Sequence, residues 1–393
     1  MARGARVALA CAVLAVGLNA AAARANPYVA AEGVYAKAPA LGIRIGTLAA
    51  GANDAITDVA GVRVGQITHI EGEGRLRPGA GPVRTGVTAI IPRDDLWHRK
   101  VPAAIWALNG NGEMTGAHWV NEAGMLEVPI LLTDTLSVGR VDDGVVTWMI
   151  RRYPEIGIDD DVPLPVVAEC DDQFLDDIQG RHAVAADAVA ALDAAAAIPP
   201  EQGAVGAGTG MMAFQFKAGI GTASRVISTA NGGYTVGVLV NANMGRRPQL
   251  LVDGVSVGRA LTDLMPKRPT PDGSIIIVLA TDAPLDHAEL LALARRAALG
   301  LARTGATSMP GSGDLVIAFS TANVVPHYPQ AATYPMTVLS RYHIDPVFTA
   351  AEDATEEAIL NALLAAQTMT GRDGNTAYAL PHERLRALLA EHR

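Results

Sequence analysis

The sequence predicts an α+β protein with layered sheets and helices, rather than a regular alternation of parallel strands and helices. Short apolar runs between glycine turns fill the first two-thirds of the chain, which is typical of strands and hairpins. Apolar side chains at helical spacing dominate the last third. With 40 Gly and 23 Pro in a chain that is 50% hydrophobic, many strands and tight turns are expected, and 393 residues can bury a substantial core.

Most predicted elements lie between clear turn signals. The alanine-rich composition of residues 183–197 favours a helix, and Asp286 is a suitable N-cap for another. Residues 109–116 form a polar, glycine-rich loop after a strand, which indicates either a binding loop or an ordinary turn. We expect strands at residues 61–65, 86–92, 103–108, 130–132, 163–168, 234–240 and 315–319, and helices at 142–152, 183–197, 290–303, 356–369 and 383–392.

One strand is apolar enough to be central in a sheet. Five consecutive β-branched or leucine side chains follow Ser274, as in a strand buried on both faces. The strand would hold Ser274 rigidly at its first position, and Gly273 before it gives the backbone access to unusual angles. The Asp272-Gly273 turn in front of Ser274 is also typical of an ordinary hairpin.

Self-cleavage between Gly273 and Ser274 would convert this serine into an N-terminal nucleophile. A buried serine hydroxyl is a weak nucleophile without a base. The new α-amine would have a pKa of about 8, roughly two units below that of lysine. It would be partly neutral near pH 7 and could accept the proton of the hydroxyl on its own residue. The chain would then work as two fragments, residues 26–273 and 274–393.

The first 25 residues differ from the rest. Arg3 and Arg6 precede an apolar run at residues 7–18, which is short for a membrane span, and Ala23-Arg24-Ala25 is an A-x-A cleavage site. We expect a signal peptide at residues 1–25, cut after Ala25, and a periplasmic or secreted protein; a membrane anchor is the alternative. The formal charge of −9 argues against nucleic acid as a partner. Cleavage would leave Cys170 as the one cysteine, without an intramolecular disulfide.

Other motifs compete with Ser274. Ser256 lies in Gly254-Val255-Ser256-Val257-Gly258, which matches the G-x-S-x-G nucleophile elbow, and Asp286 and His287 could complete a triad. Residues 203–210 hold four glycines but lack the Gly-Lys-Ser/Thr of a phosphate-binding loop. The nine histidines form no H-E-x-x-H pair, so neither a metal nor another cofactor is predicted.

Seven blocks of the mature sequence carry a family resemblance: residues 84–89, 108–116 with His118-Trp119, 166–169, 206–211, 217–225, 236–245 and 273–285. In these blocks and in their order, the sequence resembles the DmpA/BapA group of self-processing aminopeptidases, the P1 or S58 peptidases. This group includes L-aminopeptidase/D-amidase-esterases and β-peptidyl aminopeptidases. The resemblance implies a four-layer αββα sandwich like that of N-terminal-nucleophile hydrolases, made of two fragments from one precursor, and homo-oligomers of such fragment pairs.

The resemblance also implies roles for individual residues. Ser274 would be both the self-cleavage residue and the acylated nucleophile. Ser312 and Asp314 match the pair that hydrogen-bonds the nucleophile and its amine. Asn243 matches the donor to the oxyanion, and Glu169 matches the acid that binds the free amino group of the substrate.

One position departs from the family. Asp171 stands where some members carry an aromatic residue that helps to bind the scissile carbonyl. An ionised acid cannot donate a hydrogen bond there, so Asp171 is not expected to supply that contact to the carbonyl. The alternative hypothesis is that Glu169 and Asp171, as two carboxylates, favour substrates with cationic amino termini.

The sequence therefore predicts a serine aminopeptidase acting on short peptides, amides or esters with a free amino group, soluble after cleavage of the signal peptide. Three alternatives stay open: a conventional triad hydrolase using Ser256, a non-enzymatic periplasmic binding protein, and acyl transfer as in the self-cleaving ornithine acetyltransferases.

Overall fold

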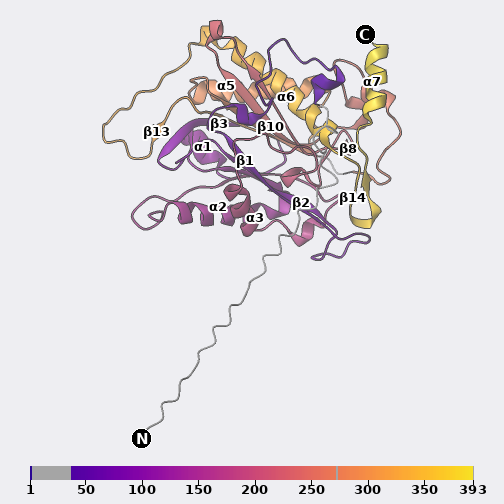
Figure 1. Ribbon diagram of the computed structural model, residues 1–393, viewed down its shortest axis with the longest axis horizontal. Helices are drawn as coiled ribbons and strands as arrows, with labels where there is room; N and C mark the ends of the chain where they lie inside the picture. Colours follow the sequence, from indigo (N-terminus) through magenta and orange to yellow (C-terminus); the bar gives the residue numbers. More distant parts are fainter. Residues whose placement is uncertain (2–36, 271–272, 393) are drawn as a thin grey trace.

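The computed structural model describes Met1, residues 37–270 and residues 273–392. Residues 2–25 of the predicted signal peptide and Asp272 of the predicted turn lie outside the described residues. Two sheets are stacked in the middle of the molecule and helices cover both outer faces, with α5 and α6 on one side and α2 and α3 on the other (Figure 1). The fold is the expected α+β, four-layer αββα sandwich.

The smaller sheet has four strands in the order β1 (Arg63–Glu71), β2 (Val83–Ile91), β5 (Ile130–Asp134) and β6 (Val166–Cys170). The first three strands pair antiparallel, whereas β5 and β6 are parallel. Helices α2 (Val138–Arg152) and α3 (Ala185–Asp193) cover its outer face. Every residue of β2, β5 and β6 is buried, as expected for strands between two layers.

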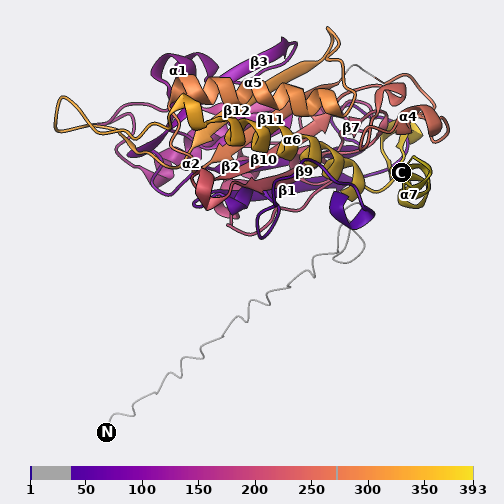
Figure 2. The same cartoon turned by 90° about the horizontal axis from the view of Figure 1, so that it is seen from above.

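The larger sheet has the order β13-β3-β12-β11-β10-β9, with β4 beside β3. Helices α5 (His287–Arg303) and α6 (Asp345–Ala365) lie across its outer face (Figure 2). The strands of this sheet are β3 (Arg99–Gly110), β4 (Met125–Leu126), β9 (Ile220–Val226), β10 (Thr235–Asn243), β11 (Ser274–Thr281), β12 (Gly313–Ser320) and β13 (Val325–Pro326).

Strand β11 is central in this sheet, as its sequence predicts. All eight of its residues are buried. Ile275, Ile277 and Leu279 pack into the core beneath α5 and α6. Ile276 and Val278 pack into the core shared with the smaller sheet. This alternation buries both faces of the strand, because successive side chains of a strand point to opposite faces.

The remaining elements are short and lie at the ends of the sheets. They are α1 (Ala117–Ala123), α4 (Val257–Ala260), α7 (His382–Glu391), and the two small hairpins β7 (Met212–Ala213) with β8 (Phe216–Lys217) and β14 (Met369–Thr370) with β15 (Thr376–Ala377). A search of the described residues found no helix that is both long and apolar enough to span a membrane.

Some predicted boundaries were wrong. Helix α6 begins at Asp345 and not at residue 356. The prediction took the acidic residues before 356 as part of a solvated loop, whereas Asp353 is buried in the helix and pairs with Arg303. Helix α2 begins four residues early and α3 is shorter than predicted. The sequence analysis also missed β9, whose glycine and serine residues weaken the strand pattern although six of its seven residues are buried.

Candidate active site

Ser274 is the first residue of β11 and its side chain is buried, with 6% of the residue exposed. It lies on the same face of the strand as Ile276 and Val278, so it points into the space between the two sheets. The Ser274 hydroxyl accepts a hydrogen bond of 3.2 Å from the backbone N–H of Gly313. The hydroxyl is therefore fixed at the first residue of a central strand, next to the start of β12.

Gly273 separates two small pockets in front of this serine. A Cβ atom at Gly273 would lie 1.6 Å from the carbonyl oxygen of Asn243, so only glycine fits there. Both pockets are bounded by Gly273, Met244 and Gly245. The first also contains Ser312, Asp314, Arg246, Gln249 and residues 306–309, and the second contains Asp171, Asn243, Phe174, Gly210, Met212, Gln215 and Thr270.

Ser312 and Asp314 flank Gly313, the residue that contacts Ser274 at the start of β12. Strands β11 and β12 are parallel, and Ile275 is paired with Asp314. The Ser312 hydroxyl donates a hydrogen bond of 2.7 Å to Asp314 Oδ1. Burial raises the pKa of Asp314, and hydrogen bonds from Ser312 and Ser308 act against that rise. A carboxylate in this position can hold an ammonium group at the start of β11.

Asn243 is the last residue of β10 and lies directly opposite Ser274 in the antiparallel pair. Its Oδ1 accepts a hydrogen bond from Met212 N at 2.9 Å, and its Nδ2 donates to the carbonyl of Asp171 at 2.8 Å. These two bonds fix the orientation of the amide. An amide NH₂ has two hydrogens, so the bond to Asp171 leaves a second N–H for a substrate oxygen.

The glycine-rich segment at residues 203–210 supports Asn243 and is not built as a phosphate loop. A Cβ atom at Gly208 would lie 2.3 Å from Ile220 N, so the glycine allows close packing against β9. The fully buried Lys217 ammonium donates to the carbonyls of Gly208, Met211 and Ala218 at 3.2, 2.7 and 2.6 Å. These bonds anchor the backbone that precedes Met212, whose N–H holds Asn243.

Glu169 belongs to β6 of the smaller sheet, so it reaches the site from the opposite layer. Its Oε1 accepts a hydrogen bond of 3.0 Å from Glu113 N, and its Oε2 accepts one from the Thr135 hydroxyl. Burial raises the pKa of Glu169, and these two bonds act against the rise. An ionised carboxylate has about four acceptor positions, so an ammonium group can still bind.

Asp171, two residues further on, lines the second pocket, whereas Glu169 lines neither pocket beside Gly273. The Asp171 carboxylate accepts hydrogen bonds from the backbone and side-chain nitrogens of Gln173 at 2.8 and 2.6 Å. Burial raises the pKa of Asp171 as well. The structure thus places Asp171 in the second pocket and Asp314 in the first, with Gly273 bounding both.

The residues of the alternative triad are not brought together. Ser256 is exposed before α4, and Leu251 nearby donates a hydrogen bond to Thr304 at the C-terminal end of α5. Asp286 and His287 lie at the opposite end of this 17-residue helix, about 25 Å away. Asp286 caps the helix and His287 Nδ1 contacts the carbonyl of Ala103, so neither is positioned to activate Ser256.

Sequence reasoning missed several contributors to the site. The N–H of Gly313 contacts the nucleophile, and Thr135 binds Glu169. Neither residue belongs to a motif that marks it, although Gly313 lies between the two predicted residues Ser312 and Asp314. Within the described ranges, no group of three or more His, Cys, Asp or Glu side chains is arranged to hold a metal ion.

A serine at the start of a central strand, inside an αββα sandwich and beside an amide and a Ser–Asp pair, defines an N-terminal-nucleophile type of hydrolase fold. The chain belongs to peptidase family S58, whose family model matches residues 54–377. The family and the fold expected from the sequence are thereby confirmed, and so is the prediction of a peptide-bond hydrolase.

Three similar proteins illustrate the match. The chain is 45% identical over 358 residues to the beta-peptidyl aminopeptidase BapA of Sphingosinicella microcystinivorans, covering 87% of this chain and 89% of the relative. The L-aminopeptidase D-Ala-esterase/amidase of Ochrobactrum anthropi, described as a variant of the Ntn hydrolase fold, has a TM-score of 0.85 at 42% identity, covering 91% of this chain and 98% of that one. The PH0078 protein of Pyrococcus horikoshii OT3 has a TM-score of 0.87 at 45% identity, covering 91% and 99%.

Proposed function

We propose that this chain is a self-processing serine aminopeptidase that releases N-terminal residues from short peptides, amides or esters through an acyl-enzyme on Ser274. The observation that carries the proposal is that Ser274 is paired with Asn243 of β10 and accepts a hydrogen bond from the N–H of Gly313, the residue between Ser312 and Asp314. An oxyanion donor and an amine-binding carboxylate on either side of one serine are what an N-terminal nucleophile needs.

Self-cleavage would begin with attack of the Ser274 hydroxyl on the carbonyl carbon of Gly273. The Oγ–C bond forms and the C–N bond of the peptide breaks, so the hydroxyl proton ends on the released amine. Water then hydrolyses the ester. Arg246 supports this geometry, because its Nη1 donates to the carbonyl and the hydroxyl of Thr270 at 3.4 and 3.2 Å, which fixes the chain upstream of the cut.

The same groups would then serve the substrate. Ser274 attacks the scissile carbonyl while its own α-amine accepts the hydroxyl proton and later passes it to the leaving amine. Asp314, held by Ser312, stabilises the ammonium that forms between these steps. The second N–H of Asn243 binds the oxyanion, because Asn243 is paired with Ser274 across the two strands.

The two carboxylates of β6 and the following loop would select substrates with a free amino group. Glu169 is held by Glu113 and Thr135, and Asp171 lines a pocket beside Gly273. A substrate ammonium bound there directs its own carbonyl towards Ser274. The relatives named as aminopeptidases support this substrate class.

Intact-mass analysis and N-terminal sequencing of the purified protein test the proposal. We expect two fragments, the smaller beginning Ser-Ile-Ile-Ile and running from residue 274 to residue 393. Ser274→Ala should give one inactive, uncut chain, whereas Ser256→Ala should be cut and active. A single uncut chain that hydrolyses aminoacyl amides would overturn the proposal.

We also propose that the protein is exported to the periplasm or secreted, with residues 1–25 removed. The charged start, the apolar run and the A-x-A site support this proposal. Cell fractionation with N-terminal sequencing tests it, and the larger fragment should begin at Asn26. A larger fragment that retains Arg3 in the cytoplasmic fraction contradicts it.

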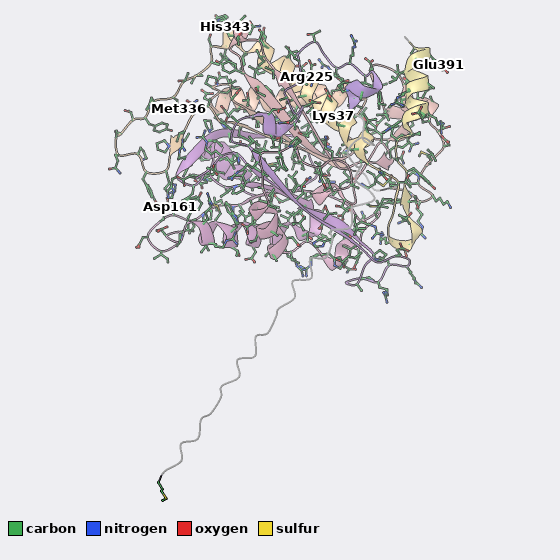
Figure 3. All side chains as sticks on the ribbon, viewed as in Figure 1. Lys37, Asp161, Arg225, Met336, His343 and Glu391 are labelled. Atoms are coloured by element: carbon green, nitrogen blue, oxygen red, sulfur yellow. The ribbon has the colours of Figure 1, made fainter. Side chains whose placement is uncertain are left out.

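Homo-oligomers of the fragment pair are a further proposal. Asp161 and Met336 lie at one end of the molecule, and Glu391 lies at the other (Figure 3). Near Asp161, Ile158 is 79% exposed and Val162 is 62% exposed, an unusual exposure for large apolar side chains. Light scattering should give a multiple of the fragment-pair mass, and Ile158→Lys with Val162→Lys should reduce it.

A further inference from the structure

The loop at residues 109–115, here called the bridging loop, connects the two halves of the active site. One half lies on the larger sheet, with Ser274, Asn243 and Asp314 on β11, β10 and β12. The other half lies on the smaller sheet, where β6 carries Glu169. The halves belong to separately paired sheets, so their spacing depends on whatever connects the sheets at this edge.

The first part of the bridging loop is tied to the loop that carries Ser312. The amide Nδ2 of Asn109 donates to the carbonyls of Met309 and Ser312 at 2.5 and 2.7 Å. The Nδ2 of Asn111 donates to the carbonyl of Gly311 at 2.9 Å. Two side chains therefore bind three backbone carbonyls of the turn that precedes Gly313.

The strand pairing changes at the same place. Asp314 is paired with Asn109 and Leu315 with Ala107, so the register between β3 and β12 shifts and Leu108 is an extra residue in β3. A bulge of this kind bends the strand and redirects its end, and bulges are frequent next to active sites. Beyond the bulge, Asn109 and Gly110 stay paired with Asp314 and Gly313 at the start of β12.

The second part of the bridging loop is tied to β6. Glu113 N donates to the Glu169 carboxylate at 3.0 Å. The Thr115 hydroxyl donates to the carbonyl of Pro165 and accepts from Val167 N, both at 2.9 Å. Thr115 N in turn donates to the carbonyl of Val167 at 3.0 Å.

Two glycines allow the loop to pass this closely between the halves. A Cβ atom at Gly313 would lie 2.4 Å from the carbonyl oxygen of Asn111. A Cβ atom at Gly112 would lie 3.2 Å from Glu169 Oε1 and 3.4 Å from Gly313 Cα. A side chain at residue 112 would therefore meet both halves.

We propose that the bridging loop sets the distance between the nucleophile and the amine-binding carboxylate, with Asn109 and Asn111 as positioning residues for Ser312 and Asp314, and Thr115 as the positioning residue for Glu169. This inference rests on the proposed aminopeptidase function. None of the three side chains needs to contact the substrate. Each acts through the group that it holds, and a displacement of about 1 Å at a reacting group can cost up to about 100-fold in rate.

Substitutions at the two ends of the bridging loop should affect different kinetic constants, kcat at the Asn111 end and KM at the Thr115 end. Asn111→Ala releases the turn before Ser312 and leaves the Glu169 contacts in place, so kcat should fall about tenfold with KM within about twofold. Thr115→Val has nearly the same volume but lacks the hydroxyl. It loosens β6, so KM for an aminoacyl amide should rise about tenfold while kcat changes little.

Asn323→Ala is the matched control. Asn323 also exchanges side-chain hydrogen bonds with a backbone, that of Thr337 at 2.8 and 3.0 Å, but it follows β12 at the end away from Asp314. The Asn323→Ala substitution should lower the melting temperature without changing kcat or KM. Asn109→Asp and Asn111→Asp keep the side-chain shape and remove the donor, so they supply the test if an alanine variant does not fold.

The outcomes separate the two proposals. The positioning role is supported if Asn111→Ala lowers kcat alone and Thr115→Val raises KM alone. Both variants should melt at or above the melting temperature of Asn323→Ala. Equal changes in both constants, or kinetics that match Asn323→Ala, overturn it while leaving the aminopeptidase intact. If wild-type protein is uncut, or Ser274→Ala is active, the proposed function itself fails, and the loop inference fails with it.

Discussion

Asn243 and Ser274 are directly opposite each other on the antiparallel strands β10 and β11. Residues paired in this way have Cβ atoms about 5 Å apart and point to the same face of the sheet. Sheet pairing, with no loop in between, therefore fixes the distance between the proposed oxyanion donor and the proposed nucleophile. The carbonyl oxygen of Asn243 also occupies the space that a Cβ atom at Gly273 would need. Asn243 is therefore next to both residues of the proposed cut.

Asn243→Ala should lower kcat by about 100- to 1000-fold, because the variant loses the side-chain donor to the oxyanion. KM should change little, since the ground-state carbonyl gains less from that donor than the transition state does. Steady-state kinetics on the processed fraction of the variant measures both constants. A fall in kcat of less than about threefold would contradict the assignment.

Asp314→Asn should move the acid limb of the pH profile of kcat/KM to lower pH. A nearby carboxylate favours the protonated form of the Ser274 α-amine and raises its pKa, so removal of the charge lowers that pKa. The amine is then neutral at a lower pH, although the rate should fall because the ammonium intermediate loses its partner. The profile between pH 5 and 9, recorded on cleaved protein, measures the shift. A shift to higher pH argues against this placement of the amine.

Asp171→Asn should raise KM for substrates with a free amino group by about tenfold, the loss expected for one charge-assisted hydrogen bond. The variant keeps an oxygen that can accept from the Gln173 backbone, so the loop should stay in place. An ester without an amino group serves as the internal control and should be hydrolysed equally well by both proteins. An unchanged KM for the amine substrate removes Asp171 from the binding site.

Asp176→Asn should flatten the dependence of stability on pH. Burial raises the pKa of Asp176 to about 7, and the carboxylates of Asp134 and Asp177 add to the rise, whereas the Arg84 N–H and His182 oppose it. Because the folded pKa exceeds the unfolded value of about 4, the stabilising contribution is complete below pH 4 and is lost as the pH rises through 7.

Melting temperatures between pH 5 and 8 measure this effect. Wild-type protein should lose more stability over that range than Asp176→Asn, and the exposed residue Asp159 supplies a control substitution, Asp159→Asn. The variant keeps an oxygen for the 2.5 Å hydrogen bond from Arg84 N, so the local structure should be retained. Parallel curves for all three proteins would contradict the titration of Asp176 in the folded state.

The strand at Ser274 could be predicted because burial on both faces leaves a local mark, an unbroken run of apolar side chains. The same logic placed most of the other long strands but missed β9, whose glycine and serine residues interrupt the apolar run. The apolar pattern did not predict the first half of α6, because acidic residues interrupt it there. Glu352 and Asp353 pair with Arg303, which lies about 50 residues away in the sequence, so no local pattern marks them as part of a packed helix.

The candidate residues were recognised one by one, from a family resemblance and from the chemistry of an N-terminal serine. Their mutual positions were not predictable. Asn109 and Ser312 are about 200 residues apart in the sequence and yet share a hydrogen bond, and no spacing rule connects them. The G-x-S-x-G motif at Ser256 shows the converse, because a correct local pattern lies at the wrong end of α5 for its partners.

The sequence by itself determined the family, the apolar central strand and the identity of the candidate nucleophile, since these depend on residue type and on neighbours along the chain. Only the tertiary structure decided that Glu169 reaches the site from the other sheet, and that the loop at residues 109–115 joins the two halves. The physical reason is that side-chain periodicity reports which face of an element is buried, whereas the convergence of groups depends on strand order, register and the packing of one sheet on another.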